Sequence, residues 1–120
     1  MVVSHSEHET VYGEPFNVGW EDSPHRALRN STLDGWEAAG RPSSARPGDG
    51  DAVAVYADGT PVIRYSSVMP GPSMTGDLEA LALFAGQSTG LIHSVEPAAK
   101  IVADLARDAE ATLRRASSLI

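Results

Sequence analysis

Residues 52–65, AVAVYADGTPVIRY, decide the fold of this chain. The runs 52–56 and 60–65 are strand-like, and Asp58–Gly59 between them is a strong hairpin signal because both residues tolerate positive φ. Pro61 cannot donate a hydrogen bond to a neighbouring strand, so its run is expected at an open sheet edge. The stretch therefore predicts a β-hairpin near the middle of the chain.

Helix signals lie on both sides of this hairpin. Ser23 as a cap and Pro24 at the first helical position predict a helix that ends near Gly40. Residues 75–84 begin with a capping threonine and acidic residues, which predict a short helix. The longest helix is expected over 96–117, where apolar residues share one face. They are Ala98, Ile101, Val102, Leu105, Ala109 and Leu113.

The remaining segments are polar or rich in turn residues. Residues 1–10 are expected to be mobile, and residues 12–18 to be extended. Residues 40–51, GRPSSARPGDGD, contain no large apolar side chain and predict a surface loop. A hairpin with about three helices in 120 residues predicts one small α+β domain over 1–120.

Composition excludes several classes of function. Nine basic against sixteen acidic side chains give a net charge of −7, which repels a phosphate backbone, so we expect no nucleic-acid partner. The absence of cysteine excludes disulfides and thiolate zinc sites. No apolar run approaches the roughly 18 residues of a membrane span, and no secretion signal is recognised, so we expect a cytoplasmic protein without a membrane partner.

One short motif raises a catalytic possibility. Gly86-Gln87-Ser88-Thr89-Gly90 matches G-x-S-x-G, in which the serine follows a strand and has an acid and a histidine farther along the chain. Here a helix is expected before Ser88, and the downstream His93 is only five residues away. A hydrolase site is therefore not favoured over a glycine-bracketed turn.

The other histidines suggest no strong site. His5 and His8 have metal-ligand spacing beside acidic residues, but a solvated tail is the favoured interpretation near a chain end. His25 is expected in the first turn of a helix, at the surface or an interface. No residue has an acid or base partner evident in the sequence, so we nominate no catalytic residue and no metal ligand.

Several segments, taken in order, carry a family resemblance. They are Phe16–Trp20, Pro24–Asn30, Tyr56–Val62, Arg64–Ser67, Thr75–Asp77, Phe84–Ile92 and Pro97–Ala99. Their order and spacing resemble the C-terminal third of nitronate monooxygenases, also called 2-nitropropane dioxygenases. The resemblance covers about residues 10–115.

The resemblance implies a small domain packed over the mouth of an FMN-containing TIM barrel, in an enzyme that oxidises alkyl nitronates with O₂ to a carbonyl product and nitrite. The barrel, its phosphate loops and its catalytic histidine have no counterpart in this chain. Gly86, Gln87 and Ser88 resemble the segment near the flavin, where glycine permits close approach and the other two offer polar groups. We therefore expect an incomplete oxidoreductase that requires a barrel chain in trans.

A different class of function stays open. The chain can instead be a stand-alone binding or dimerisation module without redox activity. A small domain separated from a barrel exposes an apolar face, and such a face favours self-association.

Overall fold

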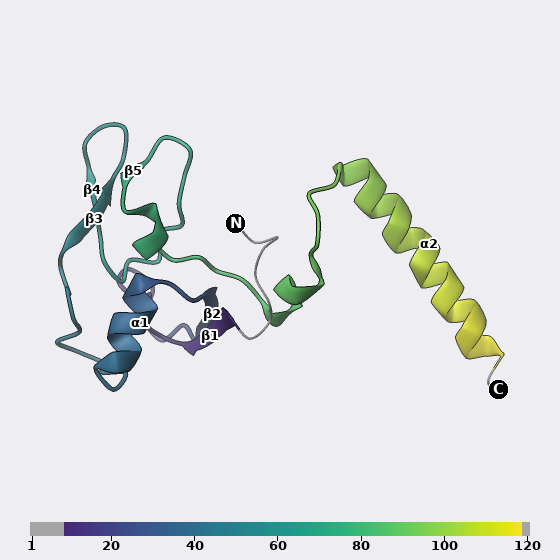
Figure 1. Ribbon diagram of the computed structural model, residues 1–120, viewed down its shortest axis with the longest axis horizontal. Helices are drawn as coiled ribbons and strands as arrows, with labels where there is room; N and C mark the ends of the chain where they lie inside the picture. Colours follow the sequence, from purple (N-terminus) through teal and green to yellow (C-terminus); the bar gives the residue numbers. More distant parts are fainter. Residues whose placement is uncertain (1–8, 119–120) are drawn as a thin grey trace.

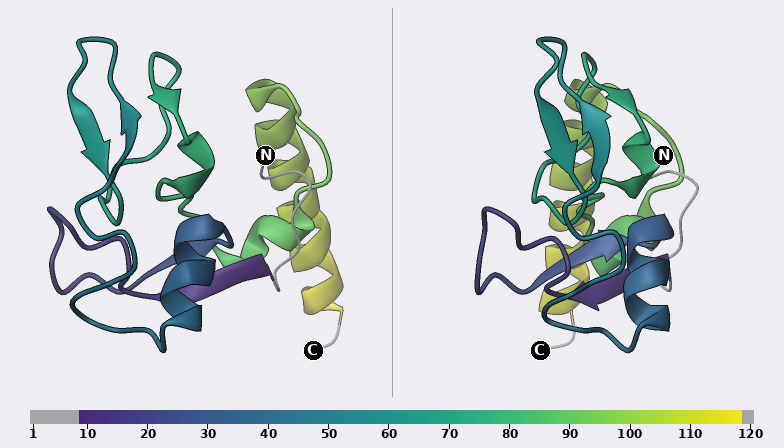
Figure 2. Two further views of the ribbon diagram at one scale, coloured as in Figure 1. Left: turned by 60° about the vertical axis from the view of Figure 1, so that its left-hand side comes forward. Right: turned by 90° about the vertical axis from the view of Figure 1, so that its left-hand side faces the viewer.

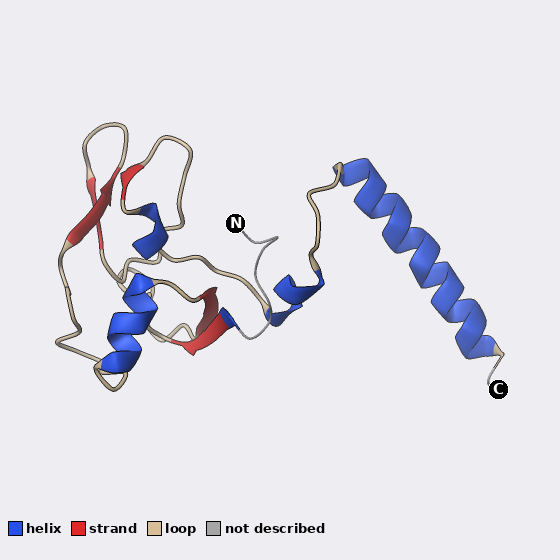
Figure 3. Ribbon diagram, viewed as in Figure 1, coloured by secondary structure: helices blue, strands red, loops and turns tan. Residues whose placement is uncertain are grey.

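The computed structural model describes residues 9–118. In chain order the elements are β1 (Thr10–Gly13), β2 (His25–Leu28), α1 (Ser31–Ala38), β3 (Ala52–Val55), β4 (Pro61–Ile63), β5 (Thr75–Gly76), the 3₁₀ segments η3 (Leu78–Ala80) and η4 (Gln87–Leu91), and α2 (Ala98–Ser117). Two antiparallel sheets and two α-helices confirm the expected α+β class (Figure 1, Figure 3).

The predicted hairpin is confirmed. β3 and β4 pair antiparallel across a turn in which Gly59 has φ +85° and the Tyr56 N–H donates to the Thr60 carbonyl at 2.9 Å. The sheet order is β4-β3-β5, so the strand that contains Pro61 lies at an edge as expected. Figures 1 and 2 place this hairpin at one end of the body and the β1–β2 pair at the other.

The prediction of a helix over residues 75–84 is wrong. Its first residues form β5 beside β3, and a Cβ on Gly76 would lie 2.7 Å from the Val53 carbonyl oxygen. Gly76 also has φ +112°, so the close approach of the two strands requires glycine at this position. Helical structure in this stretch is limited to the three residues of η3.

The prediction of a helix that begins at Pro24 is also wrong for its first half, because His25–Leu28 form β2. β2 pairs antiparallel with β1 on one side. On its other side, the Leu28 N–H donates to the Leu83 carbonyl at 2.8 Å, and segment 83–85 runs alongside. Strand pairing on both sides supplies more hydrogen bonds than a helix beginning at Pro24 could make with its first turn.

The α-helix begins later than expected, at Ser31. Asn30 is extended, and its Oδ1 accepts a hydrogen bond from the Leu33 N–H at 3.0 Å, so Asn30 rather than Ser23 caps the helix. The predicted end is confirmed: the helix ends at Ala38, and Gly40 follows in the left-handed region at φ +84°.

The core consists of two neighbouring apolar clusters. One gathers around β1, β2 and α1 and contains Val11, Phe16, Ala27, Leu33, Trp36, Tyr65 and Ala82. The other lies against the hairpin and contains Val53, Ala54, Val62, Met74, Ala80 and Leu81. Residues 80–82 contribute to both, so this short segment, which begins at the last residue of η3, joins the two halves of the body.

The last helix is confirmed, but its surroundings differ from those of the rest of the chain. α2 follows Pro97, close to the predicted range, and Figure 1 shows it apart from the body at the end of an extended connection. None of its residues is buried, so the predicted apolar stripe faces solvent. The radius of gyration of 18.5 Å accordingly exceeds the roughly 14 Å of a compact chain of this length.

Candidate functional site

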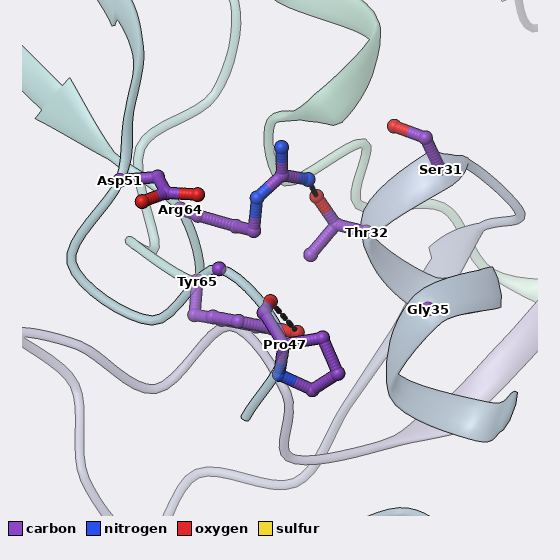
Figure 4. A pocket seen from close by; sticks show the side chains of 8 residues that line it. Ser31, Thr32, Gly35, Pro47, Asp51, Arg64 and Tyr65 are labelled. Carbon is purple, nitrogen blue, oxygen red and sulfur yellow. Dashed lines mark hydrogen bonds between the residues drawn. The ribbon is translucent and has the colours of Figure 1, made fainter. Parts of the chain in front are cut away.

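A polar cavity of about 280 Å³ lies between α1, the loop before β3 and the residues that follow β4 (Figure 4). Its walls are formed by Ser31, Thr32, Gly35, Pro47, Gly48, Asp51, Arg64 and Tyr65. The Arg64 Nη1 atom donates to the Thr32 hydroxyl at 2.8 Å, and that hydroxyl donates to the Ala80 carbonyl at 2.8 Å. The guanidinium is therefore held at the cavity wall by a chain of hydrogen bonds.

The cavity presents polar side chains. It offers the Arg64 guanidinium, the Asp51 carboxylate and the Ser31 hydroxyl. The hydroxyl is already engaged, because it donates to the Glu79 carboxylate at 2.7 Å. Among the lining residues there is no nucleophile hydrogen-bonded to a histidine, and the polar groups present can hold a small polar molecule.

Arg46 anchors the loop over residues 40–51. The loop is largely exposed, as expected, but Arg46 is only 8% exposed and points inward. Its guanidinium donates to the Pro15 carbonyl at 2.9 Å and to Asn17 Oδ1 at 2.6 Å, and it forms an ion pair with Asp49 at 3.0 Å. One buried cation thus connects the loop to the segment after β1.

Tyr65 lies beneath this anchor. The Arg46 guanidinium carbon is 4.2 Å from the ring centroid, and the phenol donates to the Pro47 carbonyl at 2.9 Å. Burial raises the pKa of the Tyr65 phenol, and the positive charges of Arg46 and Arg64 offset this only in part. The neutral phenol is therefore the form that the folded chain favours.

Ionisation of the Tyr65 phenol is expected to lower the stability of the protein in alkali. A phenol whose pKa is higher in the folded than in the unfolded chain contributes stability that is present below about pH 10 and is lost as the pH rises through the folded pKa. We expect the free energy of unfolding to fall more steeply above about pH 10 in the wild type than in Tyr65→Phe. Urea unfolding at a series of pH values measures the two slopes, and equal slopes would contradict the assignment.

The turn predicted to approach a flavin is at the surface. Gly86, Gln87 and Ser88 are exposed and lead into η4, where the Thr89 N–H donates to the Gly86 carbonyl at 3.1 Å. They do not line the cavity of Figure 4. Gly86 has φ −77°, and a Cβ there would meet nothing nearer than 3.7 Å, so the fold itself does not require glycine.

Neither His25 nor His93, the two histidines of the described chain, is hydrogen-bonded to the Ser88 hydroxyl. The expectation of a helix before Ser88 is wrong, since residues 83–85 are extended. However, both ring nitrogens of His25 are engaged: Nδ1 bonds the Ser23 carbonyl at 2.8 Å, and Nε2 accepts from the Phe16 N–H at 3.3 Å. Contrary to expectation, His25 is a buried strand residue, and it does not serve Ser88.

An uncovered apolar surface follows the turn directly. Leu91 is 76% exposed, Val95 is 87% exposed, and Ile92 lies between them at 43%. Sequence reasoning missed these residues because a short apolar pair is equally typical of a buried segment. It also passed over Arg46, because the hydrogen-bond partners of this side chain lie about thirty residues away in the sequence.

Two further sequence hypotheses concern metals and membranes. Residues 9–118 contain no cluster of three or more histidine or acidic side chains that could hold a metal, and His5 and His8 lie outside that range. No helix of the same range has both the length and the apolar character needed to cross a bilayer.

Comparisons with protein-family models, curated proteins and solved structures find no match to this chain. The interpretation of the site therefore depends on its own geometry and on the resemblance described above.

Proposed function

We propose that this chain is the C-terminal segment of a nitronate monooxygenase-like, FMN-dependent oxidoreductase, and that it acts only together with a TIM barrel that holds the flavin. Bound FMN supplies the electron acceptor for the oxidation of an alkyl nitronate with O₂. The chain described here forms one wall of that site and shields it from water. The order of the resembling segments supports this assignment.

The observation that carries the proposal is the exposure of Gly86, Gln87 and Ser88 directly beside uncovered apolar side chains. Contiguous exposed apolar residues mark surfaces that another protein covers. Leu91 and Val95 are the most exposed of these side chains outside α2. A partner that covers them brings the polar turn to the edge of a shared site.

The residues present fit part of an FMN site. Gly86 has no side chain to obstruct a ligand, Gln87 offers an amide, and Ser88 offers a hydroxyl. The phosphate loops and the catalytic histidine are assigned to that barrel. A cytoplasmic location is part of this proposal.

Flavin fluorescence tests whether the chain is incomplete. The isolated chain should not quench FMN stoichiometrically at micromolar concentrations, because it supplies only one wall of the site. Addition of the chain to a barrel of this family that lacks its C-terminal segment should restore nitrite formation from an alkyl nitronate. Tight FMN binding by the isolated chain would refute incompleteness, and a barrel that gains no activity would refute the role of the chain.

Gln87→Ala should lower the activity of the reconstituted complex about tenfold, which corresponds to one lost hydrogen bond in the closed site. Thr60→Ala, at the exposed hairpin turn, is the matched control and should leave the rate unchanged. Steady-state nitrite assays on both variants measure the effect. Equal rates for the two variants would remove Gln87 from the site.

The second candidate is a stand-alone module that binds another chain without redox chemistry. α2 specifically favours it, because a long helix with no buried residue has an apolar face free for a partner. The two candidates are distinguished by the reconstitution assay, since a simple binding module would not restore nitrite formation.

A further inference from the structure

α2 is a helix that lacks tertiary support. None of its 20 residues is buried, and Val102, Leu105 and Leu113 are 66%, 66% and 70% exposed. Ion pairs along the helix, such as Lys100–Asp104, add only about 0.3–0.5 kcal/mol each. Most of the stability of helices in proteins comes from the packing of an amphipathic face, so the apolar face of α2 is expected to pack against a partner.

The spacing along this face is that of a coiled coil. Apolar or small residues recur at alternating intervals of four and three, at Ala98, Val102, Leu105, Ala109, Thr112 and Ala116. A seven-residue repeat of this kind places one seam against another helix of the same type. The small residues in the second half of the seam allow two helix backbones to approach closely.

The charge distribution favours an antiparallel arrangement of two copies. Residues 9–97 carry twelve acidic and five basic side chains, so two bodies placed side by side would repel each other. An antiparallel pair places the bodies at opposite ends of helices about 30 Å long. This separation exceeds the screening length of about 8 Å at physiological salt.

One antiparallel register also pairs opposite charges. When Ala109 faces Thr112 of the second copy, Asp108 lies opposite Arg115 of that copy, and the symmetry of the dimer produces this contact twice. In the single chain, the Arg115 guanidinium has only a weak bond of 3.3 Å to the Thr112 hydroxyl. It is therefore available for a carboxylate across the interface.

We propose that α2 pairs with α2 of a second copy of this chain as an antiparallel coiled coil, in the register that places Asp108 opposite Arg115. This inference deepens the second candidate function and is independent of the flavin proposal, because it involves neither the turn at Gly86 nor the apolar residues beside it. The seam is short and rich in alanine, so the dimer is weak, with a dissociation constant on the order of 10 μM.

Sedimentation equilibrium tests the pairing through matched variants. Leu105→Asp should weaken dimerisation at least about 100-fold, because it buries a charge in the seam. Ala111→Asp introduces the same side chain on the outer face of the helix. This variant should leave the dissociation constant of the dimer within about twofold of the wild-type value. Both positions are exposed in the single chain, so neither variant disturbs the folded body. A chain that stays monomeric at about 1 mM, or equal effects of the two variants, would overturn the proposal.

Charge exchange tests the register. Asp108→Arg alone and Arg115→Asp alone should each weaken self-association about tenfold, because each brings like charges together. A mixture of the two variants should form a heterodimer about as strong as the wild-type dimer, since every facing pair is then of opposite sign. Failure of the mixture to associate would overturn this register.

The cysteine-free sequence permits a direct test of direction. A mixture of Ala109→Cys and Thr112→Cys should form a disulfide between the two variants rapidly under mild oxidation, since these positions face each other in the antiparallel pair. Ala109→Cys by itself should crosslink more slowly. Faster crosslinking of Ala109→Cys by itself would indicate a parallel pair and would overturn the proposal.

Discussion

Tyr65→Ala is expected to lower the free energy of unfolding by about 4 kcal/mol. The side chain is 1% exposed and belongs to the cluster formed by β1, β2 and α1. Its ring supports the Arg46 guanidinium at 4.2 Å, and its phenol holds the Pro47 carbonyl. The variant thus leaves a cavity and deprives the loop over residues 40–51 of its support. Single domains are stable by only about 5–15 kcal/mol, so this loss is a large fraction of the total.

Tyr65→Phe separates the two contributions of this side chain. It retains the ring beneath Arg46 and removes only the hydrogen bond to Pro47, so the expected loss is about 1–2 kcal/mol. Urea unfolding followed by tryptophan fluorescence measures both variants, because Trp36 lies in the same cluster. A loss below about 2 kcal/mol in Tyr65→Ala would show that the loop does not depend on this ring.

Asn30→Asp is expected to cost about 3–5 kcal/mol although it changes the side chain by one atom. Asn30 is 3% exposed, and its amide nitrogen donates to the carbonyls of Glu79 and Leu81, both at 2.8 Å. Its oxygen at the same time accepts from the Leu33 N–H at the start of α1. The variant retains the helix cap but directs a buried carboxylate at two carbonyl oxygens, so it should separate α1 from the segment that joins the two clusters.

The loss of unfolding free energy caused by Asn30→Asp should become smaller in acid. Burial and the facing carbonyls raise the pKa of the introduced carboxyl in the folded chain, so its destabilising effect is present above that pKa and is relieved as the pH falls through it. The difference in free energy of unfolding between the wild type and Asn30→Asp, measured by urea unfolding, should therefore be smaller by about 1 kcal/mol or more at about pH 5 than at about pH 8. Asn30→Ser, which retains an acceptor but does not ionise, is the control, and its gap should not change with pH. A constant gap in Asn30→Asp would contradict the donor role of this amide.

The parts of the fold that were predicted correctly depend on local signals. The hairpin followed from the turn signal Asp58–Gly59, although of these two residues only Gly59 adopts positive φ. α2 followed from an uninterrupted apolar period and from Pro97 at its start. Gly40 was correctly expected at the end of α1 for the same reason, because a left-handed residue terminates a helix locally.

The errors have a common physical cause. Residues 25–28 and 75–84 contain residues that suit a helix, but their backbone groups find partners in strands distant in the sequence. Helix propensity amounts to less than about 1 kcal/mol per residue, and pairing with β1 or β3 overrides it. The same limit applies to the site: the hydrogen bonds of Arg46 to Pro15 and Asn17 join segments about thirty residues apart, and no local pattern indicates them.

The sequence by itself determined the hairpin, the long amphipathic helix and the α+β class, since each depends on the preferences of neighbouring residues. It also indicated Gly86, Gln87 and Ser88 as a candidate turn, and the tertiary structure placed that turn at the surface beside Leu91. Only the tertiary structure decided that residues 25–28 form a strand and that the face of α2 is uncovered. Burial and long-range pairing depend on which segments meet in space, and the periodicity of a segment does not contain that information.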